Sequence, residues 1–333
     1  MSAEKIINDW KKKKYKPVYW LEGEENYFID KVTAFAEHHL LTDAEKGFNL
    51  TVFYGRDADW TQVVNACMRY PMFGELQVVL LKEAQQMKDI DKLEHYIEKP
   101  LSSTVFVVAY KEKKVDGRTK LAKLLKTNAE ILTTKKMYDS QLPSWVTEMV
   151  QSKGYTAKAK AVMLLVDHVG NDLSRLENEV EKLVINLGDR GEITEDDIEK
   201  YIGISKEYNV FELQDAMARR DLPKAMKIVQ YFESNPKAGP IQMVLPSLYN
   251  FFSKTFMVFG VPGKEEKTVA AALGINPFFV KDYLKAASAY QYEGVEKTIL
   301  LLHHYNLMSI GVGHSGGGDG GLMKEMVYKI IAG

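Results

Sequence analysis

The sequence predicts a fold of the class α/β plus all-α: an α/β domain followed by two regions built from helices. Up to about residue 140, apolar segments of strand length alternate with segments of helical apolar spacing, which is typical of a three-layer domain with a parallel sheet. Beyond that point the strand-like segments stop and the helical spacing continues. At 333 residues the chain is also too long for one ordinary domain.

The first domain is predicted to span residues 1–140. Its strand-like segments are short, rich in β-branched or aromatic residues and apolar on both faces, as strands covered on both sides are. These segments are 18–21, 50–54, 77–81, 104–109 and 129–133. Apolar residues at helical spacing between them predict helices at 27–40, 59–68, 89–99 and 120–126.

The second region, 141–205, has no strand signal. Its helical patterns cover 142–153, 157–169, 173–187 and 195–203. The segment 189–194 weakly resembles a calcium loop, but Gly188 and Arg190 stand where oxygen ligands belong. We therefore expect a turn between two helices there, with Thr194 as the N-cap of the second.

The third region, 206–333, is also predicted to be helical, with breaks at 221–223, 235–236, 261–263 and 276–277. It is rich in large aromatics, which we interpret as packed core or subunit interface. They include Phe251, Phe252, Phe256, Phe259, Phe278, Phe279, Tyr283 and Tyr290. The glycine-rich run 316–321 is predicted to be a flexible loop.

Composition narrows the function. A formal charge of −1 argues against a protein whose main role is to coat nucleic acid. The single cysteine, Cys67, excludes internal disulfides and Cys-rich zinc modules, and its apolar surroundings predict a buried structural thiol. No targeting segment or membrane-length apolar stretch is present, so a cytoplasmic location and no membrane contact are expected.

The turn after the first predicted strand is the place to look for a nucleotide site. An ATP-binding P-loop needs a second glycine, a lysine and a hydroxyl there, but residues 23–30 read GEENYFID and have none of these. Glu24 and Glu25 also stand where an anion would bind, and like charges repel. We therefore expect no bound ATP and no other cofactor.

Other sites for chemistry are weak. The neighbours His303 and His304 would point away from each other on a helix, which makes a poor metal site. No signature of nucleophilic catalysis stands out. The sequence therefore predicts no catalytic, cofactor-binding or metal-ligating residue.

The segment 70–74, YPMFG, carries Met72 and Phe73 side by side on a turn shaped by Pro71 and Gly74. A turn with proline and glycine belongs at the surface. Two interpretations stay open. Both apolar side chains could tuck under the edge of the sheet, or they could form an exposed wedge for a pocket on another protein, where each would contribute roughly 1.5–3 kcal/mol.

At this point the sequence resembles the delta subunits of the bacterial DNA polymerase III clamp loader along essentially its whole length. The resemblance rests on VYWLEGEENYFI at 18–29, YPMFGELQVV at 70–79, GNDLSRLENEVEKL at 170–183 and NVFELQDA at 209–216. The order of these four segments matches the organisation predicted above. In place of the arginine that many members carry near position 76, this sequence has Leu76.

The resemblance implies a nucleotide-free AAA+ module made of 1–140 and 141–205, followed by a helical collar domain, 206–333, that joins other subunits. It also implies that Met72 and Phe73 match the pair that inserts into the sliding clamp, the beta subunit. The implied partners are the clamp, the gamma/tau and delta prime subunits, and primed DNA within the assembled complex. The chain would then be a non-catalytic subunit of a DNA-directed DNA polymerase, a nucleotidyltransferase, that opens the clamp for loading.

Two other functions are compatible with the sequence. An active AAA+ ATPase would share the organisation, but it is disfavoured by the missing P-loop residues. A helical scaffold or DNA-binding protein without clamp affinity would leave the 70–74 turn buried. Lysines at 11–14, 111–114 and 135–136 could meet phosphates, although a solvated face is the simpler interpretation. Arg175 is interpreted as a charge on a helix surface or an interface.

Overall fold

The computed structural model describes residues 2–188, 190–263, 265–313 and 318–333. The chain divides into two compact units, Met1–Met137 and Tyr138–Gly333. Parts of two sequence predictions, at Asp189 and at Gly316 and Gly317, lie outside the described residues.

A parallel sheet forms the centre of the first unit. Its strands follow the order β2-β3-β4-β1-β5. They are β1 (Val18–Gly23), β2 (Leu50–Tyr54), β3 (Gln77–Lys82), β4 (Thr104–Lys111) and β5 (Glu130–Thr134). Each predicted strand is confirmed, because continuous apolar runs are what a sheet covered on both faces requires.

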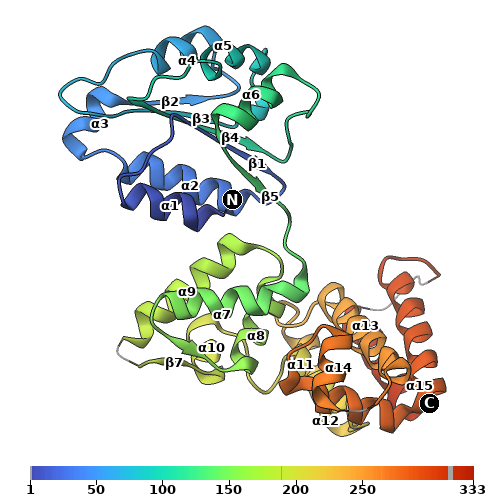
Figure 1. Cartoon of the computed structure of the whole chain (residues 1–333). Coiled ribbons are helices and arrows are strands. Elements are labelled where there is room, and N and C mark those ends of the chain that lie inside the picture. The colour runs from blue at the N-terminus through green and yellow to red at the C-terminus, as the bar shows by residue number, and fades with distance from the viewer. Residues whose placement is uncertain (1, 189, 264, 314–317) are drawn as a thin grey trace. The chain divides into compact units, whose positions relative to one another are not determined.

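Helices cover both faces of this sheet (Figure 1). Along β1, Tyr19 and Leu21 pack toward α1 (Ala3–Lys11) and α2 (Asn26–His39). Val18 and Trp20 pack on the opposite face toward α4 (Trp60–Cys67), α5 (Glu94–Ile97) and α6 (Lys120–Asn128). The three-layer α/β prediction is therefore confirmed.

The first unit differs from the prediction in three helical segments. Helix α1 was not predicted, although it buries Ala3, Ile6 and Trp10 at helical spacing. Helix α3 (Asp43–Asn49) was also missed, since its seven residues are too short for a periodic signal. The predicted helix at 89–99 is a 3-10 segment, Ile90–Leu93, followed by the single turn of α5.

The second unit begins with α7 (Leu142–Ser152), α8 (Ala159–Val169), α9 (Leu173–Leu187) and α10 (Glu195–Ile202). Thr194 is the N-cap of α10, as predicted, and its amide and hydroxyl both donate to Asp197. The expectation of no strands was wrong. Two-residue strands β6 (Thr156–Ala157) and β7 (Glu192–Ile193) pair in parallel, and they are too short to produce a periodic pattern.

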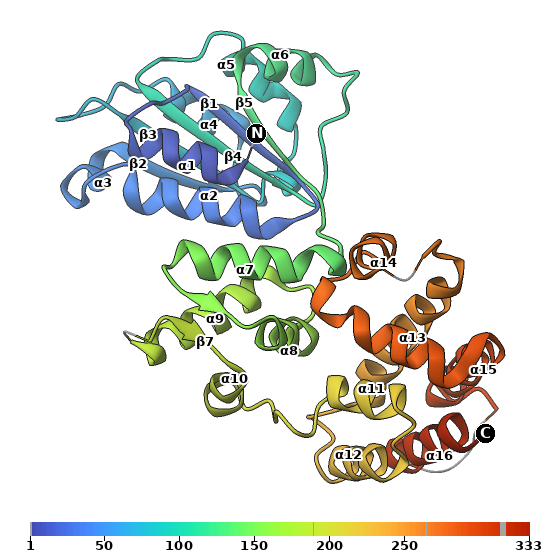
Figure 2. The same cartoon turned by 60° about the horizontal axis from the view of Figure 1, so that its bottom comes forward.

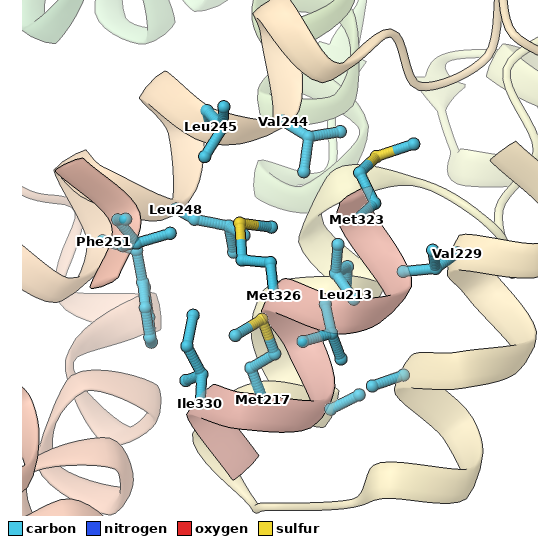
Figure 3. Close-up of a cluster of buried hydrophobic side chains, with 14 of the residues drawn as sticks. Leu213, Met217, Val229, Val244, Leu245, Leu248, Phe251, Met323, Met326 and Ile330 are labelled. Carbon is cyan, nitrogen blue, oxygen red and sulfur yellow. The ribbon is translucent and has the colours of Figure 1, made fainter. Parts of the chain in front are cut away.

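The helices that follow are α11 (Val210–Ala218), α12 (Leu222–Ser234), α13 (Ile241–Met257), α14 (Glu266–Leu273), α15 (Val280–Ser309) and α16 (Asp319–Ala332) (Figure 2). Helix α16 corrects the predicted loop at 316–321, because its first turn contains Asp319, Gly320 and Gly321. Met323, Met326 and Ile330 of α16 pack into a core shared with α11, α12 and α13 (Figure 3). Burial of this apolar face offsets the poor helix propensity of two glycines.

The aromatic residues of the third region range from fully buried to exposed, and Phe256 and Tyr283 are partly buried against the core. Phe251, Phe252 and Tyr290 are buried core residues, as predicted. Phe278 is 63% exposed and is not part of the core.

Candidate functional site

The 70–74 turn connects α4 to β3 and carries two exposed apolar side chains. Phe73 is 89% exposed and Met72 is 54% exposed. Pro71 and Gly74 on either side of them are partly buried. Of the two interpretations that the sequence left open, burial under the sheet edge does not describe this structure. Exposed neighbouring apolar side chains on a protein surface are typical of a binding site for another protein.

A buried asparagine holds the backbone of this turn. Asn49, the last residue of α3, is 0% exposed. Its Oδ1 accepts a hydrogen bond from the Met72 amide at 2.7 Å, and its Nδ2 donates to the Met72 carbonyl at 2.9 Å. Both backbone polar groups of Met72 are therefore paired with one side chain that is 23 residues away in the sequence.

The backbone of Phe73 lies in the left-handed region, with φ of +57°. A bulky residue rarely adopts this conformation, because its Cβ crowds the following carbonyl group. Gly74 comes next and lies close to α3. A Cβ on Gly74 would stand 2.8 Å from Glu45 Oε1 and 3.2 Å from Asn49 Nδ2.

Helix α3 contributes a third exposed apolar side chain. Phe48 is 60% exposed, and its ring meets the Phe73 ring edge to face, with centroids 6.0 Å apart and planes at 73°. The amide and hydroxyl of Thr42 donate to Glu45 at the start of this short helix. Both hydrogen bonds lower the pKa of the Glu45 carboxyl, and the one from the Thr42 hydroxyl has the larger effect.

Sequence reasoning missed Phe48 and Asn49. The information that brings them to the 70–74 turn is the spatial order of the strands, because segments that precede neighbouring parallel strands meet at the same end of those strands. Here Leu50 of β2 pairs with Val78 of β3. The end of α3 and the 70–74 turn therefore lie side by side. The strand order needed for this inference is not readable from local patterns.

The turn after β1 differs from the 70–74 turn, because its polar groups form hydrogen bonds within the protein. The amides of Glu24 and Glu25 donate to the carbonyl and hydroxyl of Thr134 at 3.3 and 3.2 Å. The Glu25 carboxylate accepts from the Tyr27 amide at 3.2 Å, at the start of α2. Gly23 has φ of +129°, and a Cβ there would lie 2.1 Å from the Thr134 carbonyl oxygen. These groups bind one another where a P-loop would present its amides to phosphate.

Carboxylates also surround the nearby lysine at the end of β4. Lys111 Nζ lies 2.7 Å from Asp30 and 2.8 Å from Glu83. Burial lowers the pKa of the Lys111 ammonium, but hydrogen bonds to Asp30 and Glu83 outweigh it, and the pKa is raised overall. This lysine is therefore charged and held within the protein.

The other residues singled out in the sequence occupy ordinary positions. Cys67 is buried, as predicted, and burial raises the pKa of its thiol. Arg175 lies exposed on α9, and the lysines at 11–14, 113–114 and 135–136 are exposed. No group of three or more potential metal ligands forms among the described residues. In the same part of the chain, no helix has the length and apolarity needed to cross a membrane.

The chain is similar to known proteins over most of its length. Residues 19–135 match the family model for "DNA polymerase III, delta subunit". The chain is 28% identical over 290 residues to DNA polymerase III subunit delta of Bacillus subtilis (strain 168), covering 83% of both chains. It is 25% identical over 309 residues to the probable DNA polymerase III subunit delta of Aquifex aeolicus (strain VF5), covering 88% of this chain and 85% of that one.

The fold is similar to a solved structure described as the Bacillus subtilis DNA clamp loader delta protein. The two share 25% sequence identity with a TM-score of 0.55, and the match covers 99% of both chains. The match to the family model lies within the sheet unit, whereas the matches to the relatives and to the solved structure extend over most of the chain. The chain is therefore similar over most of its length to DNA polymerase III delta subunits, and its sheet unit carries the match to their family model.

Proposed function

We propose that this protein binds the sliding clamp, the beta subunit, through Met72 and Phe73 and helps to open the ring for loading onto primed DNA. The observation that carries the proposal is the exposure of both apolar side chains on a turn whose backbone is held by Asn49. Pro71 and Gly74 shape the turn. Phe48 extends the apolar surface beside Phe73.

The energy available from this surface is sufficient for a hot spot. Complete burial of a methionine or a phenylalanine contributes roughly 1.5–3 kcal/mol each. A small apolar cluster inserted into a pocket commonly dominates the energy of an interface. The net charge of −1 adds little electrostatic attraction for the chain as a whole, so the apolar contact has to supply most of the affinity.

Ring opening follows from differential affinity. A subunit that binds the open or strained ring more tightly than the closed ring shifts the population toward opening without consuming fuel. In this proposal ATP enters through the gamma/tau motor subunits. Within the assembled complex, nucleotide binding by those subunits makes the 70–74 turn accessible to the clamp. Hydrolysis then releases the turn from the clamp.

The protein itself acts without nucleotide chemistry in this proposal. Two sets of hydrogen bonds support the absence of nucleotide chemistry. The amides after β1 donate to Thr134, and the Tyr27 amide donates to the Glu25 carboxylate. These groups would have to be rearranged before a phosphate could bind. Titration with Mg²⁺ and ATP should give no binding by calorimetry, and tight magnesium-dependent binding would contradict this part of the proposal.

The two helical regions have separate roles in the proposal. Residues 141–205 complete the AAA+-like module, and residues 206–333 form the collar that joins the gamma/tau and delta prime subunits. Exposed Phe278 supports an interface role for part of this region.

The clamp-binding role is tested by comparing the wild type with Met72→Ala/Phe73→Ala. We expect the double variant to lose at least about 2 kcal/mol of clamp affinity, roughly thirtyfold or more in Kd. Surface plasmon resonance against the immobilised clamp measures this loss. Wild-type affinity in the double variant would rule out the proposed contact.

The control for this experiment is thermal unfolding. Both side chains are largely exposed, so their removal should change the melting temperature little. A large drop in melting temperature would show instead that the two side chains stabilise the fold.

A further inference from the structure

Asn49 has a role that the exposure of Met72 and Phe73 does not by itself explain. We propose that Asn49 is a positioning residue, which fixes the 70–74 turn in its clamp-binding conformation before the clamp arrives. This inference rests on the proposed function, because it concerns the same contact. It adds a residue that does not touch the clamp but determines how readily the clamp is bound.

The first argument is the geometry of the asparagine. Asn49 is fully buried and uses its Oδ1 and Nδ2 atoms on the two backbone groups of one residue, Met72. Two hydrogen bonds in opposite directions fix the orientation of that backbone as well as its position. The backbone groups of a half-exposed residue could instead bind water, so the bonds restrict conformation rather than rescue buried polar groups.

The second argument is the conformation of the neighbouring residue. Phe73 stands at φ of +57°, which a phenylalanine adopts only when surrounding contacts impose it. Met72 is held immediately before it by Asn49, and Gly74 immediately after it lies close to α3, where a Cβ would meet Glu45 and Asn49. The left-handed backbone at Phe73 is thus fixed on the Met72 side by Asn49 and lies close to α3 on the Gly74 side.

The third argument concerns the side chains that the clamp would meet. The edge-to-face contact with Phe48 supports the Phe73 ring from α3, the same helix that provides Asn49. The turn, its aromatic support and its backbone anchor therefore form one preorganised surface. Preorganisation raises affinity because the cost of ordering the loop is not incurred during binding.

The kinetic consequence distinguishes positioning from contact. If only a fraction of molecules holds the binding conformation, the apparent Kd rises in inverse proportion to that fraction. Association slows because fewer molecules are competent, whereas loss of a contact mainly speeds dissociation. Removal of the Asn49 hydrogen bonds should therefore lower the association rate, and Phe73→Ala should raise the dissociation rate.

The experiment compares Asn49→Leu, which is similar in size but forms neither hydrogen bond, with Asn49→Ala. Thr33→Ala is the matched control, because Thr33 is also buried in the sheet unit and its hydroxyl donates to Ile29 within α2. Clamp binding is measured by surface plasmon resonance. We expect both Asn49 variants to bind about tenfold more weakly, mainly through slower association, and Thr33→Ala to bind as the wild type does.

A second measurement examines the hydrogen bond directly and does not require the clamp. Hydrogen exchange followed by NMR should show that the Met72 amide of the wild type is protected. The same amide should exchange about tenfold faster or more in Asn49→Leu, because its acceptor has been removed. Unchanged exchange of the Met72 amide would overturn the inference.

The outcomes separate this inference from the proposed function. If Met72→Ala/Phe73→Ala loses clamp binding while Asn49→Leu associates at the wild-type rate, the positioning role alone is overturned. If the double variant keeps full affinity, the clamp contact is wrong and the positioning role falls with it. If the Asn49 variants lose affinity only in proportion to a lost folded fraction, Asn49 is a residue of general stability and the inference fails.

Discussion

Two turns in the sheet unit differ in whether their side chains are available to a partner: the turn after β1 and the 70–74 turn before β3. The turn after β1 pairs its amides with Thr134 and places the Glu25 carboxylate on the start of α2. The 70–74 turn before β3 also has its backbone held by a distant side chain, that of Asn49, but its apolar side chains point to solvent. The first turn has its polar groups satisfied internally, whereas the second leaves its side chains available to a partner.

This contrast shows that a parallel α/β sheet can present its binding surface at either end of its strands. Ligands of open parallel α/β sheets usually bind at the carboxyl ends of the strands, where loops and helix N-termini present polar groups. In this protein those ends carry internal hydrogen bonds and the ion pairs of Lys111. The exposed apolar surface lies at the amino ends of β2 and β3 instead.

The largest expected effect tests the two glycines that accompany these turns. Gly23→Ala should destabilise the protein by about 3 kcal/mol or more, because the new Cβ would meet the Thr134 backbone at a strained φ. Gly74→Ala should cost no more than about 1 kcal/mol, since the nearest atoms belong to side chains. Urea unfolding measures both values. Equal destabilisation would contradict the expectation that a Cβ facing backbone atoms costs more than one facing side-chain atoms.

Phe48→Ala is expected to have an intermediate effect, on clamp binding rather than on folding. Loss of the edge-to-face contact with Phe73 should weaken binding by about 1 kcal/mol, or roughly fivefold. Tyr54→Ala is the control, because Tyr54 is similarly exposed but lies at the carboxyl end of β2, whereas the 70–74 turn lies at the amino end of the strands. Clamp affinity is measured by titration. An equal loss of affinity in both variants would show that Phe48 contributes no more to clamp binding than an exposed aromatic residue elsewhere.

The smallest expected effect belongs to the turn after β1. Glu25→Gln should lower the free energy of unfolding by about 0.5 kcal/mol, because a neutral amide caps the start of α2 less well than a carboxylate. Clamp affinity should not change, and Mg²⁺-ATP should still not bind in calorimetry. If this neutral variant acquired nucleotide affinity, charge repulsion rather than loop geometry would be what excludes phosphate.

Much of the fold could be predicted locally. The strands β1 to β5 are continuous apolar segments, and α8, α9 and α10 follow apolar spacing closely, because burial against a neighbouring layer requires these periodicities. The start of α10 was also predictable, since Thr194 forms its cap with a carboxylate only three residues away. The composition of the 70–74 turn predicted a surface location. It left two alternatives for Met72 and Phe73, namely burial under the sheet edge or exposure to a partner.

Tertiary structure alone decided between those alternatives. The bonds of Asn49 to Met72 join residues 23 apart, and the bond of Glu25 to Thr134 joins residues 109 apart. Both depend on which strands become neighbours, and a local pattern of apolar residues contains no information about strand order. The sequence by itself therefore determined the layers and the chemical nature of each turn. Packing of parallel strands determined which turn is closed by its own polar groups and which one offers apolar side chains to another protein.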